Sequence, residues 1–340
     1  MAPTLTEVAN RAGVSLSTAS RAFSEPDRIS RDAFDRIINA ATEIGYVASS
    51  PRRQRATSRP VQSTTIAMVV PDLANPVSAQ FVKAAQAHAW HHRQTLVLAD
   101  ADGSPDRERE MLGDLQGRVD GFIAYAPRLP ARDIEELCGS APLVLFNRDS
   151  DTAPSVIADT EHGLRQAIEY LKVLGHNHIA YVQGSKHSWS NERRVAAMQE
   201  LCDELDITLE MLGWQSESIA GGHAAAAGVV ASGATAVIGH NDLVAVGLVQ
   251  GATQLGLSVP EDLSVIGIDD TSIAQVATPN LTSIQVPVSR AGVLCIDILH
   301  RAITGQATED DTAQTVHLPT QLVVRASTAP VVGWTAGGRR

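Results

Sequence analysis

Amide, carboxylate and guanidinium side chains stand directly after several apolar stretches of the chain. If those stretches are parallel strands, their carboxyl ends meet at one edge of a sheet, where ligands commonly bind. Side chains of these types suit a hydroxyl-rich solute, because each hydroxyl both donates and accepts a hydrogen bond. Asparagine and aspartate at strand ends also cap helices and form turns, so that structural role stays open for them. The candidate ligand-binding residues are Asn75, Asn147, Arg148, Arg193, Asn241, Asp269 and Gln285.

Residue patterns typical of catalysis or metal binding are missing from the sequence. It has no Gly-x-Ser-x-Gly elbow and no phosphate-binding loop that ends in Gly-Lys-Ser/Thr. The two carboxylates at 269–270 are adjacent, so their side chains diverge. The histidine groups at 91–92 and 176–178 lack a complete set of zinc ligands at the usual spacing. We therefore expect no enzyme activity, no cofactor and no bound metal.

The stretch GVSLSTASRAFS, from Gly13 to Ser24, has the small and polar residues of a helix that enters the DNA major groove. At the start of such a helix, leucine can meet a thymine methyl and serine can hydrogen-bond to several bases. Hydroxyl and guanidinium groups further along suit phosphates. A plain packing helix is the alternative. The candidate DNA contacts in this region are Thr4, Leu16, Ser17, Thr18, Ser20 and Arg21.

Three short helices are expected to position these residues. Thr4 and Glu7 can form a capping box at the start of the first helix, and Gly13 can end it. Ser15 and Ser30 are candidate caps for the second and third helices, each of which has apolar residues at helical spacing. Two helices joined by a short turn that contains glycine form a helix-turn-helix, whose second helix lies in the major groove.

From residue 65 onward the chain alternates apolar runs with amphipathic helical stretches. TIAMVV, QTLVLA and APLVLFN are examples of runs that read as buried strands. This alternation predicts parallel sheets with helices on both faces. About ten such strands are too many for one small sheet. The predicted fold class is therefore α/β, with an all-α helix-turn-helix head and a body of two doubly wound parallel-sheet lobes.

The charge distribution distinguishes the head from the body, and the cysteine pattern indicates a reducing cellular compartment. Residues 1–62 hold nine arginines and six acidic residues, whereas the whole chain has a net charge of −11. A basic head on an acidic body is expected when only the head touches nucleic acid. Cys138, Cys202 and Cys295 are scattered, which indicates buried thiols in a reducing cytoplasm. With no long apolar run and no secretory signal, we expect a cytoplasmic protein without a membrane partner.

The head resembles that of the lactose-repressor/galactose-repressor family of bacterial transcription regulators. The matching segments have a fixed order and length, and they are Val8-Ala9, Ala12-Gly13-Val14-Ser15, Thr18-Ala19-Ser20-Arg21 and Ile44-Gly45-Tyr46. Segments of the body, among them VDGFI, GHNDLVAVG and VPEDLSVIGIDD, are similar to signatures of the family's effector domain. That domain in turn is similar to periplasmic sugar-binding proteins, so the resemblance implies a periplasmic-binding-protein-like body.

The resemblance also implies the domain boundaries. A DNA-binding domain at 1–47 is followed by a hinge at 48–62, an effector-binding and dimerisation domain at 63–328, and a flexible tail at 329–340. Lobe 1 would span about 63–158 and 288–318, and lobe 2 about 159–287 and 319–328. The tail has no leucine heptad, which favours a homodimer over a tetramer.

The hinge departs from the family pattern. Members usually carry a leucine that wedges into the minor groove and kinks the duplex, but Arg55 takes that position here. Arginines suit a narrow, negative minor groove, so Arg52, Arg53 and Arg55 are further candidate DNA contacts. A basic linker without such contacts is the alternative.

The resemblance assigns roles to the polar residues at the strand ends. Arg193, Asn241 and Asp269 match common effector-contact positions, and Arg148 and Gln285 match positions used by ribose-binding relatives. The implied function is a regulator, more often a repressor, that binds palindromic operator DNA as a homodimer under the control of a sugar or nucleoside. A transporter's solute-binding protein and an enzyme of similar sheet topology are the alternatives. The head and the missing export signal argue against the first.

Overall fold

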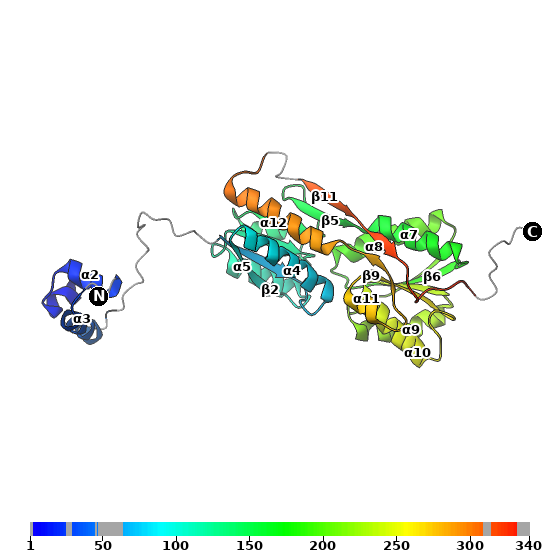
Figure 1. Ribbon diagram of the computed structural model, residues 1–340, viewed down its shortest axis with the longest axis horizontal. Coiled ribbons are helices and arrows are strands. Elements are labelled where there is room, and N and C mark those ends of the chain that lie inside the picture. The colour runs from blue at the N-terminus through cyan, green and yellow to red at the C-terminus, as the bar shows by residue number, and fades with distance from the viewer. Residues whose placement is uncertain (1–2, 25–28, 45, 47–63, 309–313, 332–340) are drawn as a thin grey trace, which may run out of the picture. The chain divides into compact units, whose positions relative to one another are not determined.

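The computed structural model describes residues 3–24, 29–44, 46, 64–308 and 314–331. The chain divides into two compact units, one up to Gln62 and one from Ser63. The first unit is all-α, and the second is built from parallel sheets covered by helices (Figure 1). The predicted α/β class, with its helical head and two-sheet body, is confirmed.

Three helices form the first unit, namely α1 (Leu5–Ala12), α2 (Leu16–Ser24) and α3 (Arg31–Ile44). The predicted capping box is present, because Thr4 Oγ1 accepts from the Glu7 amide and Glu7 Oε2 accepts from the Thr4 amide. Gly13 ends α1 in the left-handed conformation, with φ 65°, which glycine adopts without a Cβ penalty. Val8 and Ile37 are fully buried in the small core that these helices share.

Two six-stranded sheets form the second unit, and each is flanked by helices. The lobe 1 sheet has the strand order β11-β5-β4-β3-β1-β2, and the lobe 2 sheet has the order β12-β10-β9-β8-β6-β7. Neighbouring strands pair in parallel except β10 and β12, which are antiparallel. The strands are β1 (Thr64–Val70), β2 (Gln94–Asp100), β3 (Gly121–Tyr125), β4 (Leu143–Phe146), β5 (Ser155–Asp159), β6 (His178–Val182), β7 (Thr208–Leu212), β8 (Ala236–Gly239), β9 (Ser264–Asp269), β10 (Thr282–Gln285), β11 (Thr315–Pro319) and β12 (Gln321–Val323). The helices are α4 (Pro76–His91), α5 (Pro105–Leu115), α6 (Ala131–Cys138), α7 (Thr160–Val173), α8 (Trp189–Glu204), α9 (Ile219–Ser232), α10 (Asp242–Gln254), α11 (Ser272–Val276) and α12 (Val288–Thr304).

The chain passes between the two sheets three times, between β5 and α7, between β10 and α12, and between β11 and β12. Thr320 links two of these crossings, because its hydroxyl donates to the Asp159 carbonyl at 2.6 Å and accepts from the Gly163 amide at 3.0 Å. A Cβ on Gly163 would lie 2.4 Å from the side chain of Ile284. The crossings are therefore tightly packed. This packing holds the strand ends of one lobe in a defined position opposite those of the other lobe.

One predicted buried strand proves to be only half buried. Residues 94–99 lie in β2, but β2 is the edge strand of the lobe 1 sheet, and Val97 and Leu98 are 38% and 41% exposed. A run of apolar residues does not distinguish a central strand from an edge strand, because the difference depends on which strands pair.

Glycines allow α9 and α10 of lobe 2 to pack backbone against backbone. A Cβ on Gly247 would lie 2.0 Å from the carbonyl oxygen of Ile219. We expect Gly247→Ala to lower the free energy of unfolding by about 1–3 kcal/mol, because the helices must move apart. Gly228→Ala is the matched control on the exposed side of α9, where the nearest atom is a Leu212 methyl at 3.7 Å. It should raise stability by about 0.5–1 kcal/mol, and denaturant unfolding of both variants measures the contrast.

The three cysteines are free and buried, as the sequence predicts. Burial raises the pKa of Cys202 to about 11 and that of Cys138 to about 12, which keeps both thiols protonated and unreactive at neutral pH. Among the described residues, no helix has the length and the apolar character needed to span a bilayer.

Candidate functional site

The helix α2 presents a polar face that nothing in the described part of its unit covers. Ala19 and Ala22 are buried against the other helices, whereas Ser17 and Arg21 are exposed and Leu16 is 50% exposed. A half-exposed leucine at the first position of a helix contributes little to the core of its own unit. The exposed side of α2 therefore presents an apolar side chain of a type that suits a thymine methyl and a guanidinium of a type that suits a phosphate.

A network of hydroxyl groups fixes the N-terminus of α2. Ser15 Oγ accepts from the Thr18 amide at 3.2 Å, which is the predicted cap. The same oxygen lies 2.8 Å from Thr18 Oγ1 and 2.9 Å from Ser17 Oγ. Thr4 is exposed at the N-terminus of α1, and its hydroxyl serves the capping box. These contacts hold the candidate hydroxyls in place before any partner binds.

Ser20 is exposed on the same helix as Arg21. The hinge arginines Arg52, Arg53 and Arg55 lie outside the described residues, so their proposed role stays a prediction from the sequence.

Arg128 and Glu217 join the two lobes across the strand ends. Arg128 follows β3 of lobe 1, and its Nη2 donates to Glu217 Oε2 of lobe 2 at 2.8 Å. The two side chains are 6% and 20% exposed. Burial raises the pKa of Glu217, but the charges of His240 and Arg128 and the hydrogen bonds of the carboxylate more than offset this and hold its pKa at about 2. The bridge is therefore an ionised pair at neutral pH.

Arg194 lies at the centre of a buried polar cluster in the same region. It is 5% exposed, and its Nη1 donates to the His240 carbonyl at 2.6 Å. The Tyr181 hydroxyl lies 3.3 Å from both Asn191 Oδ1 and His240 Nδ1. The Arg194 Nε is buried and has no hydrogen-bond partner among the described residues. A guanidinium with an unused donor in a buried site is a binding group for a ligand oxygen.

The charges of this cluster extend across both lobes. Burial raises the pKa of Asp269 well above its usual value, and Arg194 opposes this while Asp242 and Glu217 reinforce it. Burial raises the pKa of Tyr125, on lobe 1, and the charge of Asp269, on lobe 2, raises it further. Asp269 also has a φ of 112°, which is strained for a residue with a Cβ. Its backbone thus adopts a costly conformation where the strand ends of the two lobes approach.

His240 and Asp242 complete the electrostatics of lobe 2. Burial lowers the pKa of His240 to about 3, so the imidazole is neutral at pH 7. Burial raises the pKa of Asp242 to about 6, although hydrogen bonds from Ser283 and Thr271 favour its charged form. The cluster therefore offers neutral and charged donors and acceptors side by side, which suits a polar solute better than a simple ion.

Two of the predicted ligand-binding asparagines cap helices at the strand ends. Asn75 Oδ1 accepts from the Val77 amide at the start of α4, and Asn241 Oδ1 accepts from the Val244 amide at the start of α10. Both residues are buried, at 9% and 3% exposure. The amide nitrogen of Asn241 has one long contact, at 3.4 Å to the Glu217 carbonyl. Capping uses only the oxygen of each side chain, so each amide keeps donors for a ligand.

Asn147, Arg148 and Gln285 make other contacts. Asn147 has a φ of 51°, and its Oδ1 accepts from the Ala158 amide. The charge of Arg148 acts on Glu108 of lobe 1. Gln285 donates to Asp270 and accepts from Gln321, each at 2.9 Å, so it links the residue after Asp269 to the crossing between β11 and β12.

The structure separates Arg193 from the cluster. Arg193 is exposed, and its guanidinium lies 5.8 Å from the ring centre of Trp189. It lines a cavity of about 340 Å³ beside the lobe crossings, together with Asn147, Asp159, Trp189 and His317. The helix rotates successive side chains by about 100°, so its neighbour Arg194 faces the strand ends instead. The structure thus gives Arg194 the geometry expected of Arg193.

Arg128, Glu217, Arg194 and His240 were missed by the sequence analysis. Arg194 carried a usable signal, because it shares the buried face of α8 with Asn191, Met198 and Leu201 at helical spacing. Arg128 and Glu217 stand in loops and carried no local signal.

A DNA-reading helical head and a two-lobed body with a polar site between parallel sheets define a ligand-responsive DNA-binding regulator. Residues 4–49 match the family model of bacterial regulatory proteins of the lacI family, and residues 168–328 match that of a periplasmic binding protein-like domain. The chain belongs to the lacI family of bacterial regulatory proteins.

Individual relatives align over nearly the whole chain. An uncharacterised helix-turn-helix-type transcriptional regulator of Streptomyces limosus is 30% identical, with 99% of this chain and 96% of the relative covered. The crystal structure of the lac repressor dimer bound to operator and an anti-inducer is 28% identical, with a TM-score of 0.71, and covers 97% of this chain and 100% of that one. A lacI-family regulator from Enterococcus faecium with bound ribose is 28% identical, with a TM-score of 0.71, and covers 79% and 100%.

Proposed function

We propose that this DNA-binding regulator, most simply a repressor, is controlled by a sugar or nucleoside bound between lobes 1 and 2. The DNA-binding domain at 1–47 would bind the operator. The body at 63–328 would bind the effector, and the hinge at 48–62 would connect the change in the body to the DNA-binding domain. Effector binding would shift the two lobes and so alter the spacing of two heads on DNA. To switch occupancy fully, the effector must favour one state by roughly 10⁴-fold.

The buried Arg194 guanidinium supports the effector site most strongly. Its Nε has no partner among the described residues, although an unpaired buried donor costs about 1–3 kcal/mol. A hydroxyl or carbonyl oxygen of a bound solute would recover that cost. The relative with bound ribose makes a sugar a reasonable first choice. Asp269, Asn241 and Asn75 would supply further donors and acceptors, and Arg148 would serve the lobe 1 side.

We propose a homodimer that binds palindromic operator DNA. Val97 and Leu98 on the edge strand β2, and Trp90 at 79% exposure on α4, are exposed apolar residues that a second copy would cover. The similar lac repressor structure is a dimer on its operator. A regulator of this kind acts on DNA in the cytoplasm and needs no enzyme activity.

A gel shift with DNA from upstream of its own gene tests the proposal. A palindromic fragment should bind far more tightly than the same fragment with one half-site scrambled, because two heads then share one complex. Pentoses, hexoses and nucleosides are then added one at a time, and one class should change the shift. Failure on every palindrome would overturn the operator assignment, whereas turnover of an added solute would indicate an enzyme.

A further inference from the structure

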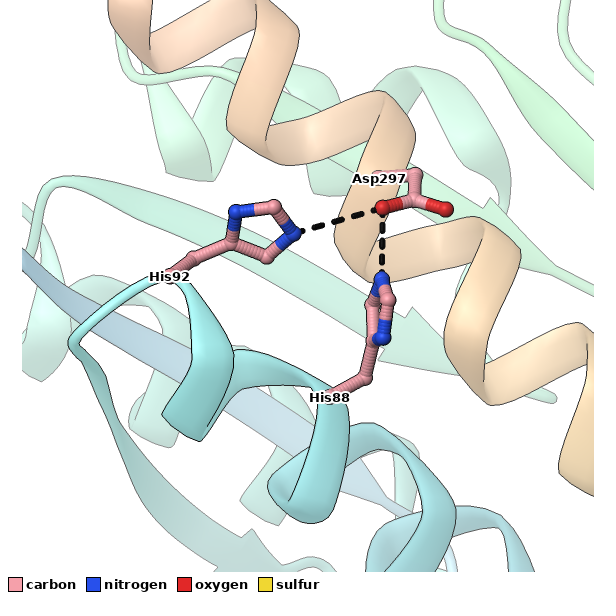
Figure 2. A group of neighbouring side chains, drawn as sticks. All are labelled: His88, His92 and Asp297. Carbon is pink, nitrogen blue, oxygen red and sulfur yellow. Dashed lines mark hydrogen bonds and ion pairs between the residues drawn. The ribbon is translucent and has the colours of Figure 1, made fainter.

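Two histidines and an aspartate from helices far apart in the sequence point at one another on lobe 1, away from the effector cluster. His88 and His92 come from the last turn of α4 and the residue after it, and Asp297 comes from α12 (Figure 2). The helices α4 and α12 pack side by side (Figure 1). One potential ligand atom from each residue lies within 4.8 Å of the other two. The proposed DNA and effector sites use none of these three residues.

His88 and His92 are four residues apart at the end of α4, which is the spacing of two histidines that bind one metal ion from a helix. Residues i and i+4 lie on one face of a helix, so His88 and His92 present their imidazoles to the same point in space. The neighbouring His91 is exposed, and its ring centre lies 6.3 Å from that of His88, but it is not one of the three residues whose ligand atoms lie together. The sequence analysis found no complete set of zinc ligands around the histidines at 91–92, because it compared only residues close together in the chain. The fold adds a carboxylate 205 residues further along the chain from His92.

The distances are close to those of a tetrahedral centre. Ligand atoms bound at about 2.1 Å from one tetrahedral zinc are roughly 3.4 Å apart. His92 Nε2 and Asp297 Oδ1 are 3.4 Å apart, and His88 Nε2 and Asp297 Oδ1 are 2.6 Å apart. A movement of His88 Nε2 or Asp297 Oδ1 by less than about 1 Å would bring their separation to that value, and the two imidazole nitrogens lie within 4.8 Å of each other. Such a shift needs only a small side-chain adjustment.

A hydrogen-bonded ion pair alone does not account for all of these groups. His88 and Asp297 are satisfied by their short contact, but His92 Nε2 is buried and makes no hydrogen bond within the described part of the chain. The ring of His300 stacks on that of His92 with centroids 4.1 Å apart, and Gln94 Nε2 lies 3.2 Å from His300 Nδ1. This second layer fixes the ring of His92, as supporting residues do around metal-ligating histidines.

The site is partly exposed and has a suitable charge. The side chains of His88, His92 and Asp297 are 26%, 26% and 37% exposed, so the group lies at the surface of lobe 1, although His92 Nε2 itself is buried. Two neutral imidazoles and one carboxylate suit zinc and its neighbours in the transition series, whereas calcium and magnesium prefer an all-oxygen shell.

We propose that His88, His92 and Asp297 form a binding site for a divalent transition metal of the zinc class, which links α4 to α12. The fourth position would be held by water. Because α4 begins directly after its cap Asn75, which follows β1, and α12 begins at a lobe crossing, the ion would tie a helix of lobe 1 to the helix that returns from lobe 2.

Calorimetric titration of the full-length, untagged and chelator-treated protein with Zn²⁺ tests the site. We expect one site per chain, and binding of Co²⁺ at the same site should give the visible absorption of four-coordinate cobalt. His92→Gln and Asp297→Asn keep the side-chain shape but remove a ligand, and each should weaken Zn²⁺ binding by at least about 100-fold. His88→Gln gives an independent third variant if either of these folds poorly.

His91→Ala is the matched control, since it removes an exposed histidine from the same helix turn. Its Zn²⁺ affinity should be unchanged, and circular dichroism should show that all variants retain their fold. Absence of stoichiometric Zn²⁺ binding in the parent protein would overturn the proposal. A loss in His91→Ala equal to that in His92→Gln would do so too, because it would indicate surface histidines rather than a formed site.

Discussion

Replacing Arg194 with lysine should abolish the effect of effector on operator binding and leave operator binding itself intact. The guanidinium fork can bind a ligand oxygen through its unused Nε, whereas lysine is a point charge that cannot reproduce that fork. A hydrogen bond to a charged group is worth about 1.5–3 kcal/mol, so effector affinity should fall by roughly 10- to 100-fold for each bond lost. The positive charge beside Asp269 is retained, which protects the fold.

Thermal unfolding of the full chain with and without effector measures this loss. An effector at a hundred times its dissociation constant stabilises the parent protein by about 2.7 kcal/mol, and the lysine variant should show a much smaller increase. Arg193→Ala is the comparison variant, because it removes a guanidinium from the adjacent, exposed position. If Arg193→Ala loses the response while Arg194→Lys keeps it, the effector occupies the cavity beside Trp189 instead.

The choice between Arg193 and Arg194 illustrates what a sequence can and cannot place. The NERR segment predicted an arginine in the cleft, and the resemblance supported that prediction. The structure buries the guanidinium one position further along, at Arg194, and one position on a helix is a rotation of about 100°. Helical periodicity would have indicated which of the two arginines is buried, since Asn191, Met198 and Leu201 mark the buried face that includes Arg194.

Interactions between neighbouring residues predicted the helix ends of the head correctly, whereas contacts between distant segments could not be predicted from the sequence. The Thr4–Glu7 capping box and the left-handed Gly13 depend on neighbouring residues only, and both are present. The Arg128–Glu217 bridge depends on how two lobes approach, and the His88–Asp297 contact depends on how α4 packs on α12. No periodicity or spacing along the chain carries that information.

Arg21→Ala should weaken operator binding and flatten its dependence on salt. Each phosphate contact contributes about 0.9 to the slope of log affinity against log salt concentration, so a homodimer that loses one contact per head should show a slope smaller by about 1.8. Arg36→Ala removes the same charge from α3, where Arg36 is 3.8 Å from Asp32. Its slope should match the parent, and an equal decrease in both variants would mean that Arg21 acts only through the net charge of the head.

Leu16→Ala should give the opposite signature, because a methyl contact carries sequence information but no charge. We expect an unchanged salt slope and a loss of about 1–3 kcal/mol that is confined to operators with thymine at the contacted position. Fluorescence anisotropy with operators substituted one base pair at a time measures this preference. Since Leu16 is already half exposed in its unit, its truncation should leave the stability of the head unchanged. A uniform loss across all operators would place Leu16 away from the bases and would remove α2 from the major groove.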